Sequence, residues 1–422
     1  MGKNVILLGI IAVFGAQLGI AQDEQRIVAL EQKVVLLERE AERNAFGETV
    51  MEVGDSVYGL GAAASKVYGV PQGVSMGGYG EALYQHYDSD KTDVFDFLRG
   101  VLYFGYKYND QWVFNSEIEF EHASTSKKGS ASVEFAYLDY LASPALNLRA
   151  GLLLVPVGIV NELHEPTAFL SARRPDVENR IIPSTWRENG VGLFGEVAEG
   201  LSYKAYVVNG LRGEQFSSKG LRGGRQKGSK AQADDFAGVL RLDYQPTTAL
   251  TTGASYYNGD SGQALDVSAN TSILEAHVDY RSKGVEFQAL YTQAELDDAA
   301  ALSRTVAGKN DDGSAKVDSE INAIGSTMSG WYVQLGYDLL AHKGDGQDER
   351  SLTPFIRFSR YNTQDSIPDG FKRNGTMDVE VTTIGVNFKP LDEIVFKADM
   401  QFYDNAAGSG VDQFNLAVGY VF

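Results

Sequence analysis

Histidines are the residues of this chain most suited to acid–base or metal chemistry, because the sequence has five histidines and no cysteine. The lack of cysteine excludes a thiol nucleophile, a thiolate zinc site and an iron–sulfur centre. His277 stands between Glu275 and Asp279, at the spacing of one strand face. The other four histidines are scattered: His86, His122, His164 and His342. A metal needs converging ligands, and a nucleophile needs a nearby base. Since no local motif provides either, we predict no metal site, no cofactor and no enzymatic activity.

Arginines form the second group with distinctive chemistry. Between residues 157 and 189, four arginines occur together with several acids: Arg173, Arg174, Arg180 and Arg187 with Glu162, Glu165, Asp176, Glu178 and Glu188. A guanidinium holds carboxylate or phosphate in a fork of hydrogen bonds and keeps its charge at any relevant pH. Acids facing these arginines across a narrow gap would create a field that orients polar solutes. Alternatively, the arginines pair with neighbouring acids and hold the segment against a wall.

A second basic segment spans residues 210–234. It contains only two acidic residues, Glu214 and Asp234, but six basic ones: Arg212, Lys219, Arg222, Arg225, Lys227 and Lys230. This excess is unusual in a chain of 422 residues with a net charge of −19. It would attract anions or bind lipopolysaccharide phosphates, unless the segment is simply a solvated loop. The acidic whole repels phosphate backbones, so we predict no nucleic-acid binding.

The first 74 residues have the composition of a targeting sequence, followed by a helix and a linker. Lys3, an apolar run over 5–14 and small residues before position 22 predict a signal peptide, residues 1–21, that is removed on export. An a/d stripe of apolar residues then predicts a helix over 22–44, which either forms a short coiled coil or lies singly on another surface. Residues 45–74, rich in glycine, alanine and serine, are expected to be a linker.

Residues 75–422 alternate apolar and polar side chains with a period of two, which predicts β-strands. Between 111 and 121, for example, Trp112 and Phe114 share one face while Glu117 and Glu119 share the other. We predict sixteen strands, near 76–87, 94–108, 111–121, 132–141, 146–156, 190–198, 201–209, 235–245, 249–258, 271–281, 285–294, 330–340, 351–361, 379–389, 394–404 and 412–422.

The connections between these strands alternate between long and short. Short turns and longer loops at opposite ends are typical of an up-and-down outer-membrane barrel, whose apolar face meets lipid and whose charged face lines water. Sixteen strands leave an aqueous lumen. The predicted fold is therefore an all-β transmembrane barrel of sixteen antiparallel strands, preceded by a short helical segment.

Several segments of residues 75–422 resemble the phosphate-selective porin (O and P) family. These segments, with a last strand ending in Phe422, are Gly77-Gly78-Tyr79-Gly80-Glu81, Leu148-Arg149-Ala150-Gly151 running to Val155-Pro156-Val157-Gly158, and Val207-Val208-Asn209-Gly210. The resemblance implies a trimeric pore in the bacterial outer membrane, and it implies that the third long loop, 157–189, folds inward as the constriction. The constriction residues would then be Arg173, Arg174, Arg180, Arg187, Glu162 and Glu165.

Charged residues at alternate strand positions are expected to line the pore. The basic and acidic members nearly balance, so they form no ring of one sign and leave the ion preference open. Those that we single out are Arg99, Arg149, Lys204, Arg241, Glu117, Glu119, Glu275 and Asp279. The sequence thus predicts an outer-membrane porin for passive diffusion of small hydrophilic solutes and ions. The alternative is a barrel anchor that tethers the membrane to the cell wall through the N-terminal helix.

Overall fold

The computed structural model describes residues 33–34, 56–310, 313–341 and 350–422. The chain divides into two compact units, Met1–Val50 and Met51–Phe422, and the features below all belong to the second. The predicted signal peptide, nearly all of the predicted 22–44 helix, the start of the 45–74 segment and His342 lie outside the described residues.

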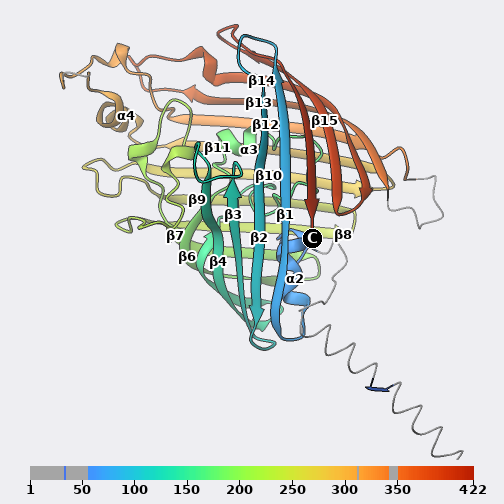
Figure 1. The fold of residues 1–422 in the computed structure, drawn as a ribbon. Helices are drawn as coiled ribbons and strands as arrows, with labels where there is room; N and C mark the ends of the chain where they lie inside the picture. The colour runs from blue at the N-terminus through green and yellow to red at the C-terminus, as the bar shows by residue number, and fades with distance from the viewer. Residues whose placement is uncertain (1–32, 35–55, 311–312, 342–349) are drawn as a thin grey trace, which may run out of the picture. The chain divides into compact units, whose positions relative to one another are not determined.

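Sixteen antiparallel strands form a closed barrel in the described part of the chain (Figure 1). Each strand pairs with its neighbours in sequence, and β1 pairs with β16 to close the sheet. The strands are β1 Gly73–Tyr87, β2 Val94–Lys107, β3 Trp112–Glu121, β4 Ser130–Ser143, β5 Leu146–Leu154, β6 Arg187–Ala198, β7 Leu201–Asn209, β8 Phe236–Thr247, β9 Leu250–Asp260, β10 Asn270–Ser282, β11 Val285–Leu296, β12 Thr327–Tyr337, β13 Ser351–Ser366, β14 Asp378–Leu391, β15 Ile394–Asn405 and β16 Gln413–Val421. The predicted fold class is confirmed.

Helices are few and short. They are α2 Ala62–Gly69, α3 Val177–Arg180 and α4 Ala299–Ala307, with 3-10 turns η1 Gly213–Gln215, η2 Arg222–Gly224, η3 Asp318–Glu320 and η4 Gly375–Met377. Within the described ranges, none of these helices has the length and apolar character needed to cross a membrane.

The barrel wall has an apolar outer face and a polar inner face. In β16, Phe414, Leu416 and Tyr420 are exposed outward, whereas Gln413 and Asn415 are buried on the inner side. This alternation follows from the strand geometry, which sends successive side chains to opposite faces of the sheet. The inner face therefore carries the charged residues that the sequence places at alternate positions.

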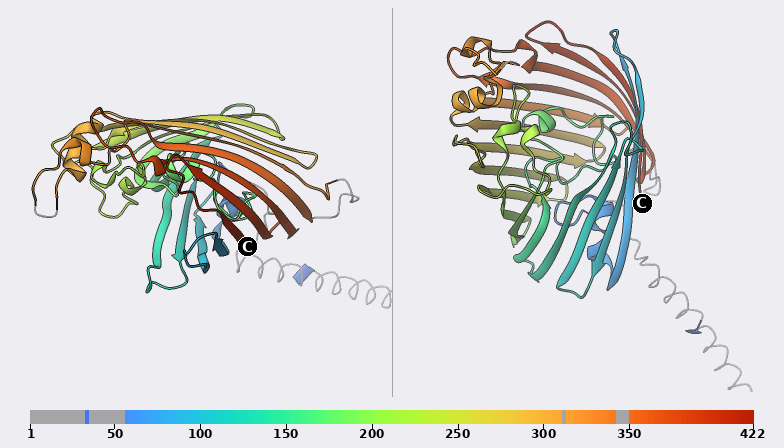
Figure 2. Two further views of the ribbon diagram at one scale, coloured as in Figure 1. Left: turned by 90° about the horizontal axis from the view of Figure 1, so that it is seen from above. Right: turned by 60° about the vertical axis from the view of Figure 1, so that its left-hand side comes forward.

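The two ends of the barrel differ in their connections. One end carries the long loops, including 155–186, 210–235 and 297–326, while tight turns such as 199–200 and 283–284 close the other. Figure 2 shows the long connections, with α4 among them, gathered at one end. Because the strand number is even, β1 begins and β16 ends at the short-turn end.

Two segments lie inside the barrel. The loop between β5 and β6 spans 155–186, so Arg187 and Glu188, which we expected within a loop ending at 189, instead begin strand β6. They pair there with Leu154 and Leu153 of β5, which extends the hairpin beyond the expected boundary. The second segment is α2, which forms within the stretch that we expected to be a linker and contacts β1, β2 and β3.

Candidate pore and inserted loop

The loop 155–186, called the inserted loop below, is anchored to the wall at widely separated strands. The Asp399 carboxylate on β15 accepts the Ala172 N–H at 2.6 Å. On β12, the Tyr332 hydroxyl donates to Glu178 at 2.8 Å. Arg241 on β8 donates to the Gly158 carbonyl. Because these strands lie around most of the closed sheet, the loop crosses the lumen and is not packed on one side of it.

The predicted constriction residues of this loop have different partners. Glu162 pairs with Lys204 of β7, and Glu165 accepts backbone N–H groups of α2. Arg174 donates weakly to the His164 carbonyl at 3.4 Å. Arg187, on β6, pairs with Glu134 at 2.9 Å. Among the described residues, Arg187 alone of the four arginines has a carboxylate oxygen within 4.0 Å.

Arginines of the inserted loop and of loop 210–235 lie close together. Burial and the positive charges of Arg225, Arg174 and Arg180 lower the pKa of Arg222. Burial and the nearby charge of Arg187 likewise lower the pKa of Arg225. Burial is the larger cause of both shifts, and the like charges add to it. The proximity is also geometric, because Arg174 of the inserted loop donates to the Thr185 hydroxyl and Arg225 of loop 210–235 donates to the Thr185 carbonyl. The sequence identified both basic segments separately but did not show that they converge.

The wall charges that we expected to line the pore lie on the inner face and are paired. Most partners sit on a neighbouring strand or two residues along the same strand. The pairs are Arg99 with Glu81 at 3.3 Å and with Glu119 at 3.4 Å, Arg149 with Asp139 at 2.8 Å, Arg241 with Asp243 at 2.7 Å, Asp279 with Arg281 at 3.1 Å and Glu275 with His277 at 2.7 Å. The wall thus carries neutralised pairs, in contrast to the arginine group of the two loops.

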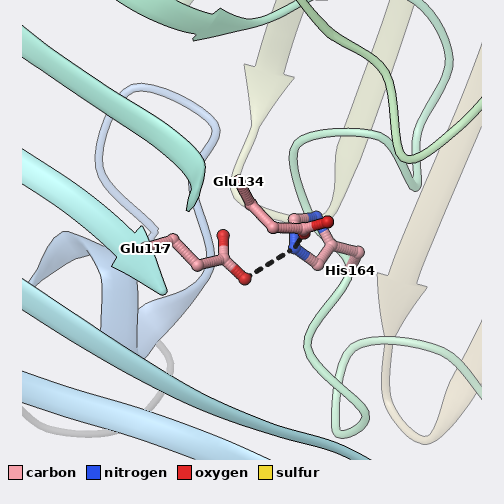
Figure 3. Close-up of side chains that lie close together, drawn as sticks. All are labelled: Glu117, Glu134 and His164. Carbon is pink, nitrogen blue, oxygen red and sulfur yellow. Dashed lines mark hydrogen bonds and ion pairs between the residues drawn. The ribbon is translucent and has the colours of Figure 1, made fainter. Parts of the chain in front are cut away.

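His164 connects the inserted loop to β3 and β4, the two strands before β5, from which the loop begins (Figure 3). Its Nε2 lies 3.2 Å from Glu117 Oε1 on β3 and 3.3 Å from Glu134 Oε2 on β4. Burial alone lowers the pKa of His164, but the two carboxylates outweigh burial and raise it to about 9. The imidazolium therefore acts as the cation between two buried acids. His164 could not be distinguished from the other scattered histidines in the sequence, because its partners Glu117 and Glu134 lie far from it along the chain.

The same three side chains have the donor types of a metal site, with ligand atoms within 4.8 Å of one another. However, one ring nitrogen already serves both carboxylates, and Arg187 binds Glu134 from another side. Side-chain cations therefore balance the acids. His277 has a comparable setting, with Glu275 at 2.7 Å and Asp243 at 3.3 Å.

A cavity of about 990 Å³ opens near the short-turn end. Paired charges line it beside apolar groups, including Lys204 with Glu162 and Arg241 with Asp243. Tyr58 and Phe194 form part of the same lining, with ring centroids 4.8 Å apart. This arrangement provides a polar space below the inserted loop that is large enough for a small hydrophilic solute.

A closed barrel of sixteen strands with a loop folded into its lumen defines the porin-like β-barrel class, and solved structures agree. An outer-membrane protein of Vibrio cholerae, OmpT lacking loop L8, matches with a TM-score of 0.52 at 13% identity, covering 83% of this chain and 100% of that one. An anion-selective porin from Comamonas acidovorans matches with a TM-score of 0.52 at 10% identity, covering 83% and 99%. The channel DcaP of Acinetobacter baumannii gives 0.51 at 14% identity, covering 83% and 97%.

In sequence, no family model matches this chain. An uncharacterized protein of Aquifex aeolicus is 37% identical over 375 residues, which cover 86% of this chain and 83% of the Aquifex protein. The chain therefore belongs to the same family as this Aquifex protein.

Proposed function

We propose that this protein is an outer-membrane porin through which small hydrophilic solutes and ions diffuse passively. The observation that carries this function is the inserted loop, which is anchored on β8, β12 and β15 and so narrows a closed sixteen-stranded barrel from within. Solved structures of this fold are named as porins and channels. The predicted signal peptide fits an outer-membrane location, and a porin-like neighbour has been solved as a trimer.

We further propose that the pore prefers anions. The paired wall charges give no ring of one sign, whereas Arg174, Arg180, Arg222 and Arg225 crowd together where the long loops meet. Uncompensated charge at a narrowing raises the local concentration of ions of the opposite sign. The resemblance to phosphate-selective porins points to the same class of solute. The exposed lysines of loop 210–235, such as Lys219 and Lys230, would bind lipopolysaccharide phosphates.

The test is the reversal potential of the refolded protein in a planar bilayer under a KCl gradient. We expect a steady conductance that reverses toward the chloride potential. The double variant Arg222→Ser and Arg225→Ser should shift the reversal toward potassium, whereas Lys219→Ser, an exposed residue of the same loop, should not. Cation preference in the unmodified protein would refute the assigned selectivity. A folded barrel without conductance would refute the porin and favour a tether.

A further inference from the structure

Helix α2 lies against the inner face of the barrel on β1, β2 and β3 (Figure 1). Glycines make this close approach possible. A Cβ added to Gly105 of β2 would stand 2.5 Å from Val67 Cγ2, and one added to Gly77 of β1 would stand 3.1 Å from the Ala63 carbonyl oxygen. Atoms at 2.5 Å cannot coexist without displacement. The wall is therefore shaped for a helix at this position.

The inserted loop caps the N-terminus of α2. Glu165 Oε1 accepts the N–H of Ala63 at 3.0 Å and of Ala64 at 3.3 Å. These are donors that an N-cap side chain normally satisfies, but the N-cap residue here is Gly61, which has none. A Cβ on Gly61 would lie 2.3 Å from the Glu165 carboxyl carbon. Gly61 thus makes room for a cap supplied from another part of the chain.

The wall holds α2 at further points. Asn115 on β3 donates its side-chain N–H to the Ala64 carbonyl at 2.9 Å. The Tyr68 hydroxyl donates to Asp139 on β4 at 2.7 Å and accepts from Arg149 on β5 at 3.0 Å. Each end of this eight-residue helix therefore has polar partners outside the helix. Without them, so short a helix would be marginal in water.

The inner wall near α2 is also unusually aromatic for a lumen that faces water. Tyr79, Tyr103, Phe135 and Tyr137 point inward, and each is at most 4% exposed. Together with Leu60, Ala63 and Ala64 they form one buried cluster. Such side chains gain stability only if something covers them. Helix α2 and the inserted loop supply the cover.

We propose that α2 is a second constriction element of the pore, joined to the inserted loop through Glu165, and that its docking on β1–β3 limits the conductance. This inference rests on the proposed porin function, because it states that α2 and the inserted loop together narrow the pore. The pore is then bounded on one part of its wall by a helix that precedes the barrel in sequence. Displacing α2 should widen the path.

The decisive variant is Gly105→Leu, because an increase in single-channel conductance has a different cause from a decrease. Leucine adds atoms to the lumen, so a pore whose α2 stays in place must conduct equally or less. If the new side chain displaces α2, the conductance of single channels rises instead. The matched control is Gly238→Leu on the outer face of β8, where an added Cβ meets no atom within 4 Å. Heat-modifiable migration on gels verifies that each barrel is folded.

A second pair of variants tests the link to the inserted loop. Glu165→Ala removes the cap and should shift the ratio of docked to undocked α2 about fivefold, which corresponds to ~1 kcal/mol. Glu165→Gln retains an acceptor oxygen and should restore most of the docking. The readout is labelling by a thiol reagent of Val67→Cys, introduced into each background, since the chain has no other cysteine. Labelling should be faster with Glu165→Ala than with Glu165→Gln.

Three results decide the proposal. Higher conductance in Gly105→Leu, with cap-dependent labelling, supports it. A chain that lacks residues 56–70, and with them α2, must conduct more than the unmodified pore; if it conducts equally or less, the proposal is overturned and the porin function stays intact. Equal labelling in both Glu165 backgrounds overturns the link. Absence of conductance in every folded barrel, including Gly238→Leu and the chain lacking residues 56–70, overturns the porin function and this inference together.

Discussion

Raising the pH should release the inserted loop at its His164 contact. The imidazolium lies between Glu117 of β3 and Glu134 of β4, with Arg174 of the loop and the Tyr79 ring of β1 nearby. Its pKa is about 9, above the ordinary value of 6.5. Because the docked pKa is raised, the stabilisation is complete below about pH 6.5 and is lost as the pH rises through about 9. A difference of this size amounts to roughly 3 kcal/mol, or about three-hundredfold in the docking equilibrium.

The assay is current noise in single channels between pH 6 and pH 10. We expect the noise of the unmodified pore to rise across pH 8–10, because neutral His164 leaves two buried carboxylates without their shared cation. His164→Gln should be noisy already at pH 6 and should change little with pH. His86→Gln, a more exposed histidine paired with Asp93, serves as the control and should behave like the unmodified protein. Equal pH profiles in the unmodified protein and in His164→Gln would refute the reasoning.

Three further changes test other contacts. Arg149→Ala leaves the fully buried Asp139 without its cation and should cost about 3–5 kcal/mol, seen as a lower temperature of heat-induced unfolding on gels; an unchanged midpoint would contradict the buried pair. Deletion of Phe422 removes both backbone hydrogen bonds to Gly78, at 2.9 Å each, that extend the β1–β16 closure, and should slow the appearance of folded barrel, whereas Phe422→Leu should not. Asp399→Ala frees an N–H of the inserted loop and should increase current noise; quiet channels would argue against anchoring at β15.

The barrel itself was predictable because its period and its connections are local properties. Each of the sixteen predicted strands overlaps one observed strand, although the ends differ by up to several residues. The difference is largest where hairpins continue past the apolar band, as in β13, which runs to Ser366 where we expected an end near 361. A strand that has left the lipid-facing zone loses its apolar alternation while keeping its ladder. Sequence periodicity therefore underestimates such strands.

Ion pairs on the barrel wall can be predicted from the sequence nearly as well as the strands, but the contacts of the inserted loop cannot. The register sets Arg99 opposite Glu81 on one side and opposite Glu121, next to Glu119, on the other, so the register of the strands indicates that a salt bridge forms. The partners of His164 depend instead on the path of a loop of over thirty residues across the lumen. No period specifies that path. It follows from tertiary contacts with strands that are far from the loop in sequence, such as those with Asp399 and Tyr332.

Helix α2 illustrates a different limit. Its sequence, AAASKVYG, lies in a stretch rich in small residues, and its N-cap position holds a glycine without capping capacity. Judged locally, the stretch is a linker; its helix becomes stable only once Glu165 and Asn115 supply partners from elsewhere. A clue nevertheless existed in the strands. Inward positions of a watery lumen should be polar, yet Tyr79, Tyr103 and Tyr137 occupy them, and inward-facing aromatics imply a covering segment. Inward-facing aromatic residues on the strands therefore indicate that some segment covers them, even though the sequence of that segment does not identify it.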